Sequence, residues 1–185
     1  MYRLWQEKLD LDYPNVIDMI QFGSSIRINS KPNDIDIAVI YEKISLDKQL
    51  STSQKIKNYL KTKSDVPIDI HSFDIDSFFK DSNFSRKNIL FYGKSLISGK
   101  YFANRFSLDP WIIIKYDLSN LEKKDKVRLN YHLSGKSGSY GMLKEAGKIF
   151  SPGVVQIRPE YEDIIISKIS EVTKDFKIER VLKEL

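Results

Sequence analysis

The sequence predicts an α/β (α+β) protein in which a mixed sheet is flanked by helices and a smaller α/β unit follows. Apolar and polar residues alternate over residues 34–41 and again over residues 66–71, a pattern that is typical of strands. Residues 46–63 lie between these segments and instead space their apolar side chains as an amphipathic helix does. Strands separated by a helix favour a layered fold over an all-helical or all-strand one.

The first part of the chain is expected to supply two strands, over residues 34–41 and 66–71, and a further segment, residues 16–22, that is either a strand or a helix running into one. Residues 16–22 form an apolar run that stops at Gly23 and Ser24. In segment 34–41, one face carries isoleucine and valine and the other carries Asp34, Asp36 and Ala38, which predicts a half-buried strand. In segment 66–71, Asp69 and His71 alternate with isoleucines in the same way.

Two helices are expected around the strand at residues 66–71. The first, over residues 46–63, has an apolar side that consists of Leu50, Ile56, Tyr59 and Leu60. The second lies within residues 72–80, where Asp76 or Ser77 is in a position to cap it.

Asp109-Pro110 marks the expected boundary between two domains, residues 1–108 and residues 109–185. The elements expected after it are a strand at 111–118, helices at 121–133 and 142–146, a strand at 154–158, a helix at 160–174 and a strand at 177–182. The sequence therefore predicts that this second part is a small α/β unit.

The composition excludes several kinds of catalytic site. The chain has no cysteine and only two histidines, which excludes thiol nucleophiles, disulfides, sulfur-ligated metals and multi-histidine zinc sites. Metal chemistry would therefore depend on carboxylates, which suit a hard cation such as Mg²⁺. The net charge of +5 is compatible with an anionic partner. No apolar segment has the length of a signal-peptide core or a membrane span, so a cytoplasmic protein without membrane contact is expected.

Three aspartates form the candidate metal site. Asp34 and Asp36 lie two residues apart on one strand and so project from the same face, although an Asp-x-Asp pair is also typical of a solvated strand face. Asp69 would join them if its strand pairs beside the first. Three carboxylates at one sheet edge can hold two metal ions, and the Gly23-Ser24 turn offers amides and a hydroxyl to phosphate.

These motifs, taken together, resemble those of the polymerase-β-like nucleotidyltransferase superfamily, in its minimal form, over about residues 1–108. The string Phe22-Gly23-Ser24 is followed after nine residues by Asp34-Ile35-Asp36-Ile37 and later by Ile68-Asp69-Ile70. Arg27 falls where minimal members often carry an arginine, while Ile28 replaces the glycine that usually follows it.

The resemblance implies transfer of a nucleoside monophosphate from an NTP to an acceptor hydroxyl, dependent on Mg²⁺ or Mn²⁺. It implies that Asp34, Asp36 and Asp69 are the catalytic metal ligands and that Gly23, Ser24 and Arg27 bind the nucleotide. The acceptor would be a nucleic acid or a protein, and minimal members often act in toxin–antitoxin pairs. Residues 109–185 would serve acceptor binding or dimerisation, and a homo-oligomer is compatible with this arrangement.

Two alternatives remain open. The same fold can serve as a non-catalytic module that binds nucleic acid or a protein partner. A glycosyltransferase could use an Asp-x-Asp pair to hold a sugar-nucleotide metal, but that interpretation explains neither the Gly23-Ser24 turn nor Asp69. Residues 82–108 contain basic and aromatic residues and no acidic one, which suits either contact with nucleic acid or an ordinary core.

Overall fold

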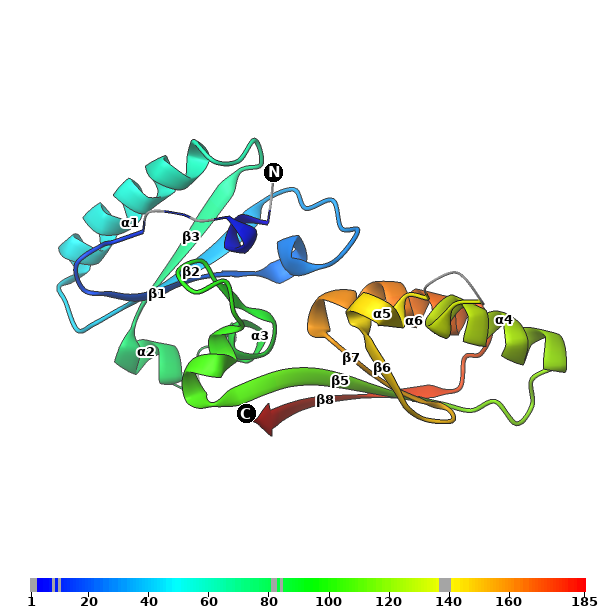
Figure 1. Ribbon diagram of the computed structural model, residues 1–185. Helices are drawn as coiled ribbons and strands as arrows, with labels where there is room; N and C mark the ends of the chain where they lie inside the picture. The colour runs from blue at the N-terminus through cyan, green and yellow to red at the C-terminus, as the bar shows by residue number, and fades with distance from the viewer. Residues whose placement is uncertain (1–2, 8, 10, 81–82, 84, 137–140) are drawn as a thin grey trace. The chain divides into compact units, whose positions relative to one another are not determined.

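The computed structural model describes residues 3–7, 9, 11–80, 83, 85–136 and 141–185 (Figure 1). It confirms the α+β class: the described residues form two four-stranded sheets and six α-helices. The chain folds into two compact units. The first unit comprises Met1–Ile26, Ser30–Leu108 and Leu185, and the second comprises Arg27–Asn29 and Asp109–Glu184.

The first unit contains a mixed sheet with strand order β3-β2-β1-β4. The strands are β1 (Val16–Phe22), β2 (Ile35–Tyr41), β3 (Ile68–Asp74) and β4 (Lys94–Ser95). β2 pairs with β1 in antiparallel and with β3 in parallel orientation. The pairing of β3 beside β2, on which the three-carboxylate hypothesis depends, is therefore confirmed.

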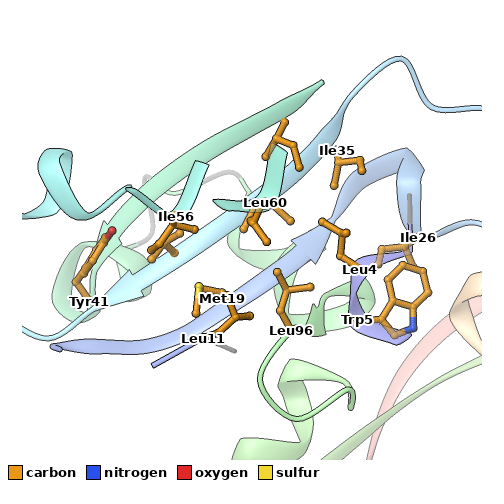
Figure 2. Close-up of a cluster of buried hydrophobic side chains, with 13 residues drawn as sticks. Leu4, Trp5, Leu11, Met19, Ile26, Ile35, Tyr41, Ile56, Leu60 and Leu96 are labelled. Atoms are coloured by element: carbon orange, nitrogen blue, oxygen red, sulfur yellow. The ribbon is translucent and has the colours of Figure 1, made fainter. Parts of the chain in front are cut away.

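Helices cover both faces of this sheet. The helical segments are η1 (Leu4–Gln6), η2 (Gly23–Ile26), α1 (Leu46–Lys61), α2 (Ile75–Phe79), α3 (Arg86–Tyr92) and η3 (Phe102–Phe106). On one face, Ile56 and Leu60 of α1 pack with β-strand side chains in the cluster shown in Figure 2. On the other face, Phe78, Ile89 and Phe102 pack against β1 and β2.

Three expectations for the first unit are wrong in detail. The strand containing Asp36 is not half-buried along its whole length, because Ala38 and Ile40 lie under α2, α3 and η3 and are fully buried. Leu50 is exposed, while Gln49 and Ser53 occupy the buried side of α1. The Tyr41 hydroxyl donates to the Gln49 backbone carbonyl and is hydrogen-bonded to the Ser53 hydroxyl.

The third correction concerns the cap of α2. The carboxylate of Asp74, rather than Asp76 or Ser77, accepts a hydrogen bond from the Ser77 amide at 2.8 Å. The helix begins one residue after Asp74, so Asp76 already lies in its first turn.

The second unit contains a sheet with strand order β6-β7-β5-β8. Its elements are β5 (Leu108–Tyr116), α4 (Lys123–Ser134), α5 (Leu143–Ala146), β6 (Gly147–Ser151), β7 (Val154–Ile157), η4 (Pro159–Tyr161), α6 (Glu162–Ser170) and β8 (Phe176–Glu184). Apart from the short α5, this is the βαββαβ order of the ferredoxin-like, or split βαβ, arrangement. β7 and β5 are its two central strands.

The helices of the second unit lie on one face of its sheet (Figure 1). Ile112 and Ile114 of β5 and Val155 and Ile157 of β7 are fully buried, as is Ile165 of α6. Strand β6 was not expected from the sequence, since its residues 148–151 are all exposed and show no apolar alternation. The segment between α4 and α5 is rich in glycine and serine and was expected to be a loop, and its residues 137–140 lie outside the described residues. No described helix combines the length and the apolar character needed to span a membrane.

Candidate functional site

Two of the predicted carboxylates lie side by side in the first unit. Asp36 of β2 and Asp69 of β3 are direct partners in the parallel register. Neighbouring strands are about 4.8 Å apart, and partners in register project from the same face of the sheet. Phe22 of β1 is the partner of Asp36 on its other side. Asp36 therefore lies in the middle of the sheet, between an aromatic ring and a second carboxylate.

The Gly23 turn approaches the Asp36 carboxylate closely. Gly23 follows β1 directly and adopts φ +75°, in the left-handed region that favours glycine. A Cβ atom at this position would lie 2.3 Å from Asp36 Oδ2, closer than any non-bonded contact allows. The absence of a side chain at residue 23 thus lets the backbone of the turn and the carboxylate of Asp36 lie next to each other.

His71 is a polar partner of Asp36. Its Nε2 atom lies 3.3 Å from Asp36 Oδ1, and its ring contacts the edge of Phe22 at a centroid distance of 5.4 Å. His71 lies two residues beyond Asp69 on β3, so the two side chains share the Asp36 face of the sheet. The side chain of Asp36 remains 27% exposed, which leaves it accessible to a ligand.

Lys57 of α1 is a polar partner of Asp69, with Nζ 3.4 Å from Oδ1. The Asp69 side chain is 62% exposed, so the pair is a surface ion pair that contributes little to stability. It does supply a positive charge beside the predicted metal ligand. Neither Lys57 nor the contact between His71 and Asp36 was identified from the sequence, because both depend on register and on the rotation of α1.

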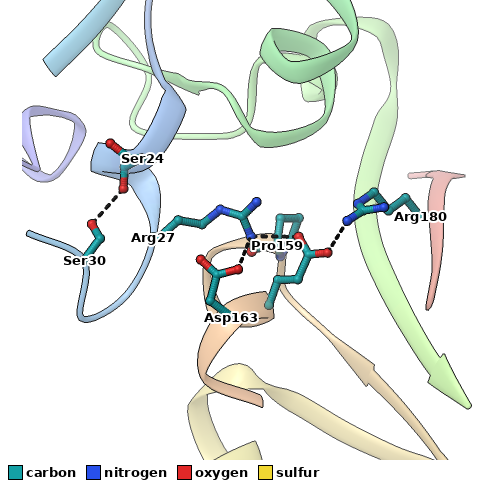
Figure 3. A network of polar contacts seen from close by, with 7 residues as sticks. Ser24, Arg27, Ser30, Pro159, Asp163 and Arg180 are labelled. Atoms are coloured by element: carbon teal, nitrogen blue, oxygen red, sulfur yellow. Dashed lines mark hydrogen bonds and ion pairs between the residues drawn. The ribbon is translucent and has the colours of Figure 1, made fainter. Parts of the chain in front are cut away.

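Asp34 and Ser24 occupy the segment between β1 and β2. Asp34 immediately precedes β2 and is partly exposed. Ser24 is exposed, and its carbonyl oxygen accepts a hydrogen bond from the Ser30 hydroxyl at 2.7 Å (Figure 3). Ser25, the next residue, is buried and bonds to the Phe22 carbonyl, which fixes the turn after β1.

Arg27 belongs by contact to the second unit. Its guanidinium binds the Glu162 carboxylate at 2.7 Å and the Pro159 carbonyl at 3.3 Å, and Asp163 lies 3.5 Å away (Figure 3). Glu162 also accepts a bond from Arg180 and is only 2% exposed. The structure therefore gives Arg27 structural partners within the second unit.

The oxygen-only donor set of the three aspartates is the kind that Mg²⁺ prefers. The adjacent carboxylates of Asp36 and Asp69 supply oxygen donors of the kind that such an ion binds. Within the described residues, however, no group of three or more histidine, cysteine, aspartate or glutamate side chains lies close enough together to hold a metal. The sheet thus brings two of the three predicted ligands, Asp36 and Asp69, together. Asp34 immediately precedes β2, the strand that carries Asp36.

No protein-family model matches the chain, and no curated protein matches its sequence.

Proposed function

We propose that the first unit is a metal-dependent nucleotidyltransferase that moves a nucleoside monophosphate from an NTP to an acceptor hydroxyl. The observation that carries the proposal is the arrangement of the Gly23 turn, Asp36 and Asp69 on one face of the sheet. A glycine turn beside a carboxylate pair places phosphate-binding amides next to metal-binding oxygens. Phosphoryl-type transfer needs both of these elements within one site.

In this proposal Asp34, Asp36 and Asp69 hold Mg²⁺ or Mn²⁺. The metal supplies charge neutralisation on the triphosphate and activates the acceptor hydroxyl. The Gly23-Ser24 turn holds the phosphate oxygens through its backbone amides and the exposed Ser24 hydroxyl. Lys57 neutralises Asp69 when no cation is bound there.

The test is transfer of label from each of four α-³²P NTPs to RNA and protein acceptors in the presence of Mg²⁺ or Mn²⁺. We expect Asp36→Asn and Asp69→Asn to abolish transfer. Asp76→Asn is the matched control, since Asp76 also ends an Asp-x-Asp sequence, Asp74-Ile75-Asp76, and its side chain is 67% exposed. Transfer that persists in the Asp36 and Asp69 variants would exclude the proposed site.

A second candidate function is a non-catalytic module that binds nucleic acid or a protein. The observation that favours it is that Asp36 and Asp69 already have protein partners, His71 and Lys57. Isothermal titration of the protein with Mg²⁺ or Mn²⁺ and a non-hydrolysable NTP distinguishes the two functions. A nucleotidyltransferase requires metal-promoted binding that Asp69→Asn removes, whereas the non-catalytic module predicts that this substitution has no effect.

A further inference from the structure

The sheet of the second unit has one face that the described helices of that unit do not cover. The burial pattern identifies the covered face, because Ile112, Ile114, Val155 and Ile157 are fully buried. Side chains alternate between faces along a strand, so the residues between them point to the opposite face. That face, called here the open face, carries Trp111, Ile113 and Lys115 of β5 and Gln156 of β7. Lys115 is exposed and Trp111 and Ile113 are partly exposed, whereas Gln156 is buried and accepts a hydrogen bond from Lys183. Helices α4, α5 and α6 all lie on the other side (Figure 1).

An indole and a guanidinium are stacked at the centre of the open face. The Arg158 guanidinium carbon lies 3.7 Å from the centroid of the Trp111 ring. Asp109 fixes both groups: Oδ2 accepts a bond from Trp111 Nε1 at 2.7 Å, and Oδ1 accepts one from Arg158 Nη1 at 2.8 Å. The stack is therefore preorganised: Trp111 belongs to the central strand β5, and Arg158 immediately follows β7, the other central strand.

Cations surround this stack. Lys183 of β8 donates to Gln156 Oε1 at 2.9 Å and lies 5.9 Å from the Trp111 ring centroid. Lys148 of β6 is the exposed strand partner of Gln156, and Lys115 is paired with Glu179 at 2.6 Å. Together with Arg158, these lysines give the open face a cationic character that the carboxylates of Asp109 and Glu179 offset in part.

We propose that the open face binds single-stranded nucleic acid. An unpaired base would stack beside the Trp111–Arg158 pair, and phosphates would approach Lys183 and Lys148. Bases of single strands stack on aromatic rings and guanidinium planes, and such binding tolerates different sequences because every base has a π face. A preorganised stack with an excess of cations complements a flexible polyanion.

This site identifies the acceptor class of the transfer reaction as a nucleic acid strand. That identification rests on the proposed function, but strand binding itself does not. Binding is therefore measured without NTP or metal, so that failure of binding and failure of catalysis are separate results.

The test uses the full chain with a fluorescein-labelled 15-nucleotide oligouridine or oligothymidine, monitored by fluorescence anisotropy at several salt concentrations. We expect Trp111→Leu to weaken binding at least about fivefold, since base–aromatic stacking contributes roughly 1–3 kcal/mol per base. Lys183→Gln should weaken binding more than Lys124→Gln. Both substitutions remove one charge from the second unit, but Lys124 lies on α4, on the helical side of the sheet.

A second measurement uses the intrinsic fluorescence of Trp111. The chain has two tryptophans, and Trp5→Phe leaves Trp111 as the sole reporter. Stacking predicts quenching of this signal on addition of the oligonucleotide. Equal affinities for duplex and single strand, or equal effects of Lys183→Gln and Lys124→Gln, would overturn the proposal. The proposal would also be overturned if the protein bound no strand and instead self-associated in a way that Trp111→Leu removes, because the open face would then be an interface between copies of the protein.

Discussion

Gly23 and Asp36 are positioned so that a side chain on the first would collide with the carboxylate of the second. The ideal Cβ of residue 23 would lie 2.3 Å from Asp36 Oδ2 and 3.3 Å from its Cγ. Gly23 directly follows β1 and Asp36 lies at the start of β2, and the segment between them includes Asp34. The contact links the predicted phosphate-binding turn directly to a predicted metal ligand.

Gly23→Ala is expected to displace the Asp36 carboxylate. The new Cβ would first meet Oδ2, at the end of the Asp36 side chain, so rotation of that side chain relieves the collision. The positive φ adds a backbone cost of about 1–2 kcal/mol. We therefore expect a moderate loss of stability in urea unfolding and a loss of nucleotidyl transfer of more than about tenfold.

Gly99→Ala is the matched control for this substitution. Gly99 also has a positive φ, +70°, but the contact that its Cβ would make is with the Trp5 carbonyl, at 3.2 Å, and not with a predicted site residue. It should lose a similar amount of stability and keep transfer activity. If both variants retain activity, the approach of the turn to Asp36 has no role in the reaction.

The sequence predicts the strands of the first unit well because their apolar alternation is strong. Asp36 and Asp69 could each be placed on a strand from this pattern, and the register shows that the two strands pair and that the aspartates are partners. Alternation also places His71 on the face of Asp69, but its contact with Asp36 and the contact of Lys57 with Asp69 could not be predicted. Their contacts depend on a one-residue register and on the rotation of α1, which no local pattern specifies.

In the second unit, one strand, β6, could not be predicted from the sequence. Strand β6 has exposed residues at an edge of the sheet, so it lacks the apolar alternation that marks the other strands. Without it, the βαββαβ order and the open face could not be deduced. The placement of Arg27 with Glu162 was also inaccessible, because it joins residues 135 positions apart.

Asp74→Ala is expected to destabilise the protein at neutral pH by about 1 kcal/mol, the usual cost of losing an N-cap. The hydrogen bond from the Ser77 amide lowers the pKa of Asp74 below its ordinary value of 3.8. The carboxylate therefore contributes stability above about pH 3.8, and this contribution is lost as the pH falls through the lower folded-state pKa.

Urea unfolding of the unaltered protein and of Asp74→Ala at a series of pH values tests this dependence. The difference between the two should be constant near neutral pH and shrink in acid. Asp74→Asn should retain most of the cap, since asparagine caps helices equally well. A difference that grows as the pH falls would contradict the assignment of Asp74 as an ionised cap.

Arg105→Gln should destabilise the first unit by about 2 kcal/mol, less than the roughly 3–5 kcal/mol that loss of one member of a fully buried pair can cost. Arg105 Nε binds Asp18 Oδ2 at 2.7 Å, and the Asp18 side chain is only 1% exposed. Removing the cation leaves a buried carboxylate with the Ser95 hydroxyl and the Met19 amide as donors. Arg105 is itself half exposed, which reduces the effect.

The control for Arg105→Gln is Lys115→Gln, which removes an ion pair of similar length from the second unit. Lys115 and Glu179 are 2.6 Å apart, but both side chains are about half exposed. Exposed pairs contribute about 0–1 kcal/mol. Equal losses of stability in the two variants would show that burial of Asp18 does not determine the cost.

Arg27→Ala separates a structural role of this arginine from the nucleotide-binding role that the sequence predicts for it. The substitution removes one of the two cations that bind Glu162, a side chain only 2% exposed, and keeps its contact with Arg180. We expect a loss of stability of about 2 kcal/mol and partial recovery in Arg27→Lys, which keeps the charge but not the planar fork. Asp163→Asn is the control, because Asp163 is 65% exposed and its substitution should change stability little.

NTP affinity is measured on the same variants. If Arg27 is structural, the apparent NTP affinity of each variant should fall only as far as its folded fraction falls. If Arg27→Ala weakens NTP binding while the unfolding midpoint stays unchanged, Arg27 contacts the nucleotide, and its ion pair with Glu162 is not what holds residues 27–29 in place.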